Sequence, residues 1–133
     1  MMKVEKSPRK TILIVDDDLV NLTILKSVIS KAGYSVLTAD NGKDALKTAK
    51  ALSPDLAILD IMMPDMDGTE VANALKQNPR TKKIPIIFLS SLISAEEERS
   101  SVEKDLISYL SKPYNREKLL NEIGKYLLLK EYK

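Results

Sequence analysis

Polar side chains that could do chemistry follow the apolar runs of this chain, at the point where each run ends. In chain order they are Asp16, Asp17, Asp60, Ser90 and Lys112. The preceding runs, such as 12–15 and 56–59, are short and continuously apolar, which is typical of strands buried on both faces of a sheet. Because the carboxyl ends of parallel strands meet at one edge of a sheet, we expect the five side chains to converge there.

Three carboxylates in one pocket, those of Asp16, Asp17 and Asp60, would repel one another unless a cation lay among them. Oxygen ligands without His or Cys suit a hard divalent cation, so the expected cofactor is Mg²⁺ or Mn²⁺. Lys112 adds a positive charge and Ser90 a hydroxyl donor, and with the cation these groups describe a pocket for a phosphoryl group. Asp60 is then the remaining nucleophile.

The composition limits the kinds of protein that this chain can be. Its 133 residues fit one domain, and 44% of them are hydrophobic, which is enough for a buried core. The absence of Cys and His excludes disulfides, a Ser-His-Asp triad, a histidine metal site and a phosphohistidine of its own. With 21 basic and 19 acidic side chains the net charge is +2, so we expect no direct DNA binding.

No segment of the sequence is suited to a membrane. The apolar runs are far too short to span a bilayer, and the basic first ten residues are not followed by the apolar core of a signal peptide. We therefore expect a cytoplasmic protein without a membrane partner.

Short apolar runs alternate with longer segments of helical period, which predicts an α/β fold with a five-stranded parallel sheet covered by helices on both faces. We expect strands near 11–16, 35–39, 55–60, 84–90 and 107–111. Helices fill the gaps, including segments near 19–32, from Asp67 onward, near 94–105 and near 115–129.

Two of these helices have an apolar face that should pack on the sheet. In the first helix this face is formed by Ile24, Leu25, Val28 and Ala32. That helix should end at Gly33, since glycine readily adopts the left-handed conformation at a helix end. The last helix should start near Asn115, and its apolar face is formed by Leu119, Ile123 and Leu127.

Two helix starts carry the reciprocal pair of a capping box. Asp67 and Glu70 open one helix, and Ser94 and Glu97 open the helix near 94–105. The second of these helices has few apolar residues, so little burial holds it to the core. We therefore expect the helix near 94–105 to be mobile.

Taken together, these motifs resemble the receiver domain of the two-component response-regulator family. The resemblance covers residues 10–129. It rests on Asp16-Asp17, Pro54-Asp55, Asp60, Met63-Pro64-Asp65-Met66-Asp67-Gly68, Ser90 and Lys112-Pro113. It implies a flavodoxin-like (βα)5 doubly wound fold with strand order 2-1-3-4-5. We assign a basic N-terminal arm to 1–10, the receiver domain to 11–130 and a C-terminal tail to 131–133.

The resemblance implies a function for the pocket. Asp60 would take a phosphoryl group from the phosphohistidine of a sensor histidine kinase or a phosphotransfer protein. Asp17, Asp60 and the backbone carbonyl of Met62 would bind the Mg²⁺, and Asp16 would help through water. Lys112 would pair with an oxygen of the phosphoryl group. The chain would be a signalling phosphoacceptor that catalyses only its own phosphoryl transfer and dephosphorylation.

The resemblance also implies a switch. Ser90 would move to hydrogen-bond the phosphoryl group, and Tyr109 would swing inward to fill the vacated space. The surface of helix four, strand five and helix five would repack, and a downstream protein target or an output domain would read it.

The chain departs from many receivers at three points. Asp105-Leu106 stands where many receivers have Gly-Ala, and Ser91 stands where they have a small residue. The turn before strand five and the residues that underlie the switch therefore differ from those of many receivers. Met62 and Leu92, which flank the pocket, are apolar, and we hypothesise that self-dephosphorylation is slow.

Two other functions fit parts of the sequence. A phosphohydrolase of the haloacid dehalogenase type would use Asp16 as nucleophile and Asp18 as acid, but it leaves 60–68 unexplained, and Asp18 can equally be a helix cap. A phosphorylation-independent interaction module could share the receiver fold, because a fold does not prove an activity. The intact set of pocket residues argues against this second alternative.

Overall fold

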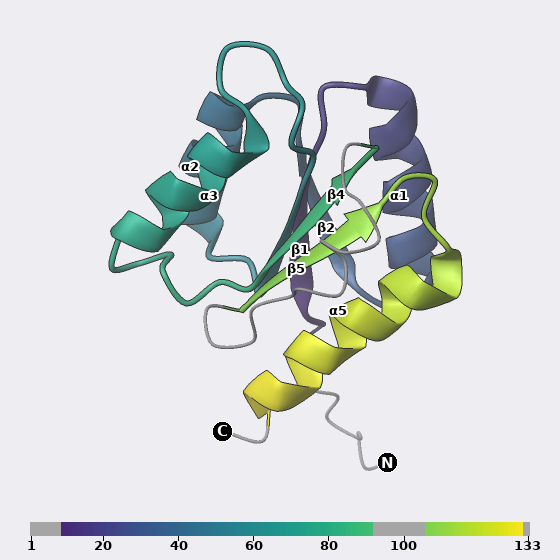
Figure 1. The fold of residues 1–133 in the computed structure, drawn as a ribbon. Coiled ribbons are helices and arrows are strands. Elements are labelled where there is room, and N and C mark those ends of the chain that lie inside the picture. The colour runs from purple at the N-terminus through teal and green to yellow at the C-terminus, as the bar shows by residue number, and fades with distance from the viewer. Residues whose placement is uncertain (1–8, 92–105, 132–133) are drawn as a thin grey trace, which may run out of the picture.

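Five parallel strands form one sheet in the order β2-β1-β3-β4-β5, and helices lie on both of its sides (Figure 1). The computed structural model describes residues 9–91 and 106–131. The strands are β1 Thr11–Val15, β2 Ser35–Ala39, β3 Leu56–Leu59, β4 Ile86–Ser90 and β5 Ile107–Ser111. The helices are α1 Leu19–Lys31, α2 Gly42–Leu52, α3 Gly68–Gln77 and α5 Arg116–Glu131. The predicted fold class and strand order are confirmed, whereas the helix predicted near 94–105 and its capping pair lie outside the described residues.

The two faces of the sheet carry separate cores. α2 and α3 pack against one face, and α1 and α5 pack against the other (Figure 1). β3 and β4 bury every residue and β1 all but its first, as their continuous apolar runs predict. The edge strands β2 and β5 carry more exposed positions. The ends of the central strands are therefore fixed by packing on both faces.

The pairing register brings the strand ends to one edge of the sheet. Val15 at the end of β1 pairs with Leu59 at the end of β3. The backbone ladder continues one residue further, because the Asp60 N–H donates to the Val15 carbonyl (2.9 Å) and the Lys112 N–H donates to the Ser90 carbonyl (3.1 Å). The loops that follow these strands thus start from the same edge, as the predicted topology requires.

α1 buries a face that only partly matches the predicted one, because Leu25 is buried as predicted but its buried neighbours are different residues. Its buried side chains are Leu22, Leu25 and Ile29. Ile24 is 49% exposed and Ala32 is exposed, so their predicted burial is wrong, and Val28 is only half-buried. Apolar residues lie on more than one side of this helix, so their spacing alone fits either face. The predicted stop at Gly33 is confirmed, since this residue has a φ of +104° just after the helix.

The helix caps follow the local sequence. The Asp18 carboxylate accepts the N–H groups of Val20 (2.9 Å) and Asn21 (3.3 Å) at the start of α1. The capping box of α3 is confirmed: the Asp67 carboxylate accepts the Glu70 N–H (3.0 Å), and the Glu70 carboxylate accepts the Asp67 N–H (3.3 Å). These caps fix where the loops after β1 and β3 turn into helices.

The apolar face of α5 packs on the sheet as predicted. Leu119, Ile123 and Leu127 are buried in the core shared with α1. The Asn115 side chain accepts the Lys118 N–H (3.1 Å) at the start of the helix, also as predicted. Among the helices of the described residues, none has the length and apolar character needed to cross a membrane.

A polar contact joins β5 to α5 within this core. The Ser108 hydroxyl donates to the Glu122 carboxylate (2.9 Å) and is hydrogen-bonded to the Tyr126 hydroxyl. Ser108 and Tyr126 are almost completely buried. The hydroxyl groups in this core therefore satisfy one another and a carboxylate.

The turn before β5 holds a non-glycine residue in the left-handed region. Leu106 has a φ of +58°, a conformation that costs a residue with a Cβ about 1–2 kcal/mol. Its half-buried side chain packs against the core between the sheet and α1 and α5, which offsets part of this cost. The Leu found here in place of a small residue is thus anchored by packing.

Gly68 lies where the start of α3 meets the loop after β3. Its N–H donates to the Ile61 carbonyl (2.9 Å). A Cβ added to Gly68 would lie 2.1 Å from the carbonyl oxygen of Asp60, which is backbone and cannot move independently. α3 therefore approaches Asp60 more closely than any side chain at this position would allow.

We predict that Gly68→Ala lowers the free energy of unfolding by about 1–3 kcal/mol, because the added methyl group overlaps the backbone. The matched control is Gly124→Ala in α5, where a Cβ would meet nothing within 4 Å. This control should raise stability by about 0.5–1 kcal/mol through helix propensity. Urea unfolding followed by circular dichroism measures both values. A Gly68→Ala protein as stable as the wild type would contradict the close approach.

Candidate functional site

The three acidic residues predicted to form a pocket lie together. Asp16 and Asp17 follow β1, Asp60 follows β3, and one carboxylate oxygen from each lies within 4.8 Å of the other two. Asp16 is 2% exposed and Asp60 is 9% exposed, whereas Asp17 faces solvent. The pocket thus has two buried carboxylates at its base and one exposed carboxylate at its mouth.

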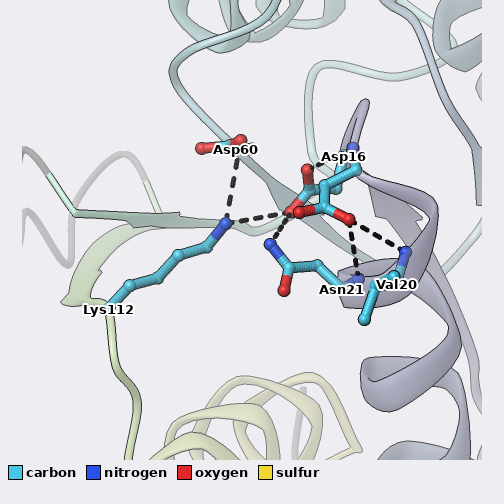
Figure 2. A network of polar contacts seen from close by, with 6 residues as sticks. Asp16, Val20, Asn21, Asp60 and Lys112 are labelled. Atoms are coloured by element: carbon cyan, nitrogen blue, oxygen red, sulfur yellow. Dashed lines mark hydrogen bonds and ion pairs between the residues drawn. The ribbon is translucent and has the colours of Figure 1, made fainter.

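Lys112 reaches this pocket from the end of β5. Its Nζ lies 3.0 Å from the Asp16 Oδ2 and 3.7 Å from the Asp60 Oδ2, so it stands between the two buried carboxylates (Figure 2). The Lys112 side chain is 21% exposed, and Coulomb attraction in such a partly buried site is screened less than at the open surface. The ammonium group therefore balances part of the negative charge of the pocket.

Both carboxylate oxygens of Asp16 have hydrogen-bond partners. Oδ1 accepts the Asp18 N–H (2.9 Å), and Oδ2 accepts Lys112 Nζ and, at 3.5 Å, the side-chain amide of Asn21 (Figure 2). The contact with Asn21 was not predicted from the sequence. A position in the first turn of a helix that starts right after the acidic pair is the only sequence signal that points to it.

The protonation of Asp60 is set by opposing effects. Burial raises its pKa from the ordinary value of 3.8 to about 6. The positive charge of Lys112 lowers the pKa, the negative charge of Asp16 raises it, and a backbone hydrogen bond with Met62 lowers it. Burial outweighs the rest, so without further positive charge Asp60 keeps its proton to a higher pH than an ordinary carboxyl group and loses it near pH 6.

Ser90 and Tyr109 lie on the neighbouring strands β4 and β5. Ser90 is 1% exposed at the end of β4, where it pairs with Ser111, the residue before Lys112. Tyr109 is half-buried and stacks on Phe88, its partner in the register, with 5.3 Å between the ring centroids. The two predicted switch residues are thus two register positions apart on adjacent strands.

The loop after β3 forms the rim of the pocket. Met62 is 61% exposed, whereas Met63 is buried in the core shared with α2 and α3. Asp65 has a φ of +67°, which gives this loop its sharp turn. Leu92, the other apolar residue expected beside the pocket, lies outside the described residues.

Asp18, the acid in the phosphohydrolase alternative, serves as a helix cap. Its carboxylate accepts two N–H groups of α1, which is the other role that the sequence allowed for it. The geometry therefore gives the phosphohydrolase alternative no specific support.

Comparison with known proteins places the chain among receivers. The model of the response regulator receiver domain family matches residues 12–124. The chain is 30% identical over 118 residues to the polar-differentiation response regulator DivK of Brucella anthropi, which covers 89% of this chain and 96% of DivK. It is 36% identical over 132 residues to a probable cyclic di-GMP phosphodiesterase of Vibrio cholerae, which covers 99% of this chain and 30% of that protein.

The chain spans less than half the length of several curated relatives that it matches, including 43% of the transcriptional regulatory protein PhoP of Bacillus subtilis.

Solved structures agree with the fold. A putative response regulator from Chloroflexus aurantiacus superposes with a TM-score of 0.81 at 30% identity, covering 91% of this chain and 99% of that one. The family match extends over most of the chain and includes all three pocket carboxylates and Lys112. The chain belongs to the response regulator receiver domain family.

Proposed function

We propose that this receiver domain is a phosphoacceptor that takes a phosphoryl group onto Asp60. The observation that carries the proposal is the position of Lys112 Nζ, 3.0 Å from Asp16 and 3.7 Å from Asp60 in an acidic pocket. A fixed positive charge beside a buried carboxylate stabilises the charge that a phosphoryl group brings. Because this chain has no His, the phosphohistidine donor lies outside it, on a sensor histidine kinase or a phosphotransfer protein.

The donor atoms of the pocket fit a magnesium ion. Three carboxylates can each offer an oxygen within 4.8 Å of the others, and the chain contains no His or Cys that would favour a softer metal. We assign Asp17, Asp60 and the backbone carbonyl of Met62 as ligands, with Asp16 acting through water. When bound, the cation neutralises the carboxylates and draws charge from the phosphoryl oxygens.

The transfer is a displacement at phosphorus. A carboxylate oxygen of Asp60 forms a bond to phosphorus as the bond from phosphorus to the donor imidazole nitrogen breaks. The electron pair of the broken bond stays on the imidazole. Lys112 pairs with a phosphoryl oxygen of the product, an acyl phosphate on Asp60.

The response to phosphorylation involves Ser90 and Tyr109. Ser90 lies at the end of β4 beside the pocket, and Tyr109 lies on the next strand. A movement of Ser90 that forms a hydrogen bond to the phosphoryl group can therefore change the packing of Tyr109 on β5. The repacked surface of helix four, β5 and α5 would then contact a downstream protein target or an output domain. Relatives named as a phosphodiesterase and a transcriptional regulator show that such receivers occur within longer proteins.

The first prediction from the proposed function is that the protein gains one phosphoryl group when it is incubated with acetyl phosphate and Mg²⁺. Intact-protein mass measures the adduct, which should be lost in Asp60→Asn and in a metal-chelated sample. Asp18→Asn is the matched control, because Asn also caps helices, and it should keep the adduct. An adduct that survives Asp60→Asn but is lost in Asp16→Asn would favour the phosphohydrolase. With neither an adduct nor beryllofluoride binding, the phosphorylation-independent module would remain.

The second prediction concerns pH in the absence of metal. Since the pKa of Asp60 is about 6 in the folded protein and near 3.8 when unfolded, the folded state binds this proton more tightly. Stability should therefore fall as pH rises from about 4 to 6, and Asp60→Asn should lack this part of the decrease. The Tm measured from pH 4 to 8 in chelator tests this, and parallel wild-type and Asp60→Asn profiles would contradict it. Added Mg²⁺ should raise the wild-type Tm more at pH 8 than at pH 5.

The third prediction concerns the lifetime of the acyl phosphate. The exposed apolar side chain of Met62 gives an attacking water no hydrogen bond. Met62→Asn would supply one, and a hydrogen bond of about 1 kcal/mol shortens the lifetime about fivefold. Loss of the phosphoryl mass after removal of acetyl phosphate measures it. Leu52→Asn, at a residue 59% exposed on α2, is the control and should leave the lifetime unchanged. Equal lifetimes in Met62→Asn and the wild type would count against slow dephosphorylation through Met62.

A further inference from the structure

Asp16 is a buried carboxylate that depends on three donors. Its Oδ1 accepts the Asp18 N–H at 2.9 Å, and its Oδ2 is shared between Lys112 Nζ at 3.0 Å and the Asn21 amide at 3.5 Å (Figure 2). With only 2% of its surface exposed, Asp16 has little access to bulk water. A carboxylate buried to this degree is stable only while its oxygens keep partners.

A phosphoryl group on Asp60 would compete for the strongest of these donors. It brings about two negative charges at neutral pH to a carboxylate that already lies 3.7 Å from Lys112 Nζ. Attraction to these charges draws the ammonium group away from Asp16. The Oδ2 of Asp16 would then lose its ion pair at the moment when the pocket becomes more negative.

The position of Asn21 allows its side-chain amide to stay hydrogen-bonded to Asp16. Its backbone N–H is held by the Asp18 carboxylate at 3.3 Å, so the first turn of α1 fixes the residue from which the amide projects. The amide is neutral, and it can donate to Asp16 without competing with Lys112 for the phosphoryl group. Its present distance of 3.5 Å is longer than the usual range for an N–H···O bond, so this bond strengthens if it shortens after Lys112 leaves.

Asn21 and Lys112 also border a common open space. A cavity of about 390 Å³ adjoins the pocket, and its lining includes both Asn21 and Lys112. The rest of the lining is formed by Leu25, Ser91, Pro113 and Tyr114. Neither side chain is therefore enclosed by the buried core on the side of this cavity.

We propose that Asn21 is a positioning residue: its side-chain amide becomes the main hydrogen-bond donor to the Asp16 Oδ2 when Lys112 moves to the phosphoryl group. The proposal rests on the proposed phosphoacceptor function. Asn21 acts through Asp16: it stabilises the phosphorylated state and contributes little to the unphosphorylated state, where Lys112 already neutralises Asp16.

The test compares the binding of Mg²⁺ alone with the binding of beryllofluoride at saturating Mg²⁺, since beryllofluoride on a carboxylate mimics a phosphoryl group. We expect Asn21→Ala to bind beryllofluoride about tenfold more weakly, the loss of one hydrogen bond to a charged group, and to bind Mg²⁺ alone within about twofold of the wild type. Calorimetric titration measures both affinities. Ser27→Ala, at an exposed position of α1, is the control and should change neither.

The Tm of the ligand-free Asn21→Ala variant shows whether weaker binding comes only from a less stable fold. Because Ala has a higher helix propensity than Asn, the variant should be at least as stable as the wild type. Unchanged beryllofluoride affinity in Asn21→Ala would overturn the inference. An equal loss for Mg²⁺ alone would also overturn it, since Asn21 would then support the pocket in every state. A wild-type protein that binds no beryllofluoride and takes no phosphoryl group would instead overturn the proposed function, and the inference with it.

Discussion

The balance of charge between Lys112 and the carboxylates of Asp16 and Asp60 is the constraint on which the rest of the site depends. The central strands β1 and β3 are buried on both faces, so the acidic groups at their ends lose much of their hydration. The compensating charge comes from the end of β5, an edge strand that β4 separates from β3. The strand order therefore contributes to the charge balance of the pocket, because it places a lysine from an edge strand beside carboxylates from the central strands.

The loops after the central strands are held as closely as the strands themselves. After β1, the Asp18 cap starts α1 within three residues of Asp16. After β3, the chain turns through Asp65 and returns so that Gly68 lies against the backbone of Asp60. Asp16 and Asp60 are thus each fixed from one side by a strand and from the other by a helix start, which would reduce the reorganisation that the proposed phosphoryl transfer requires.

Local patterns allowed much of this to be predicted, and tertiary contacts explain the rest. The continuous apolar runs located the strands, and the caps at Asp18 and Asp67 could be recognised from a few neighbouring residues. Strand order came from the family resemblance, because alternation of elements does not specify it. The buried face of α1 was predicted only in part, since apolar residues occur on several of its sides. The bond from Asn21 to Asp16 joins two neighbouring elements, and spacing along the chain alone does not reveal it.

The buried hydroxyl contact between β5 and α5 gives the edge strand two mechanically different faces. On one face Ser108 is bonded to Glu122 and Tyr126 of α5, which ties strand and helix together by directional hydrogen bonds. On the other face Tyr109 is held by ring stacking, which tolerates sliding better than a hydrogen bond does. The strand is therefore tied to α5 by directional bonds, whereas the contact on its other face restrains geometry less, so a displacement of its Lys112 end would meet less resistance on the aromatic face than on the helix face.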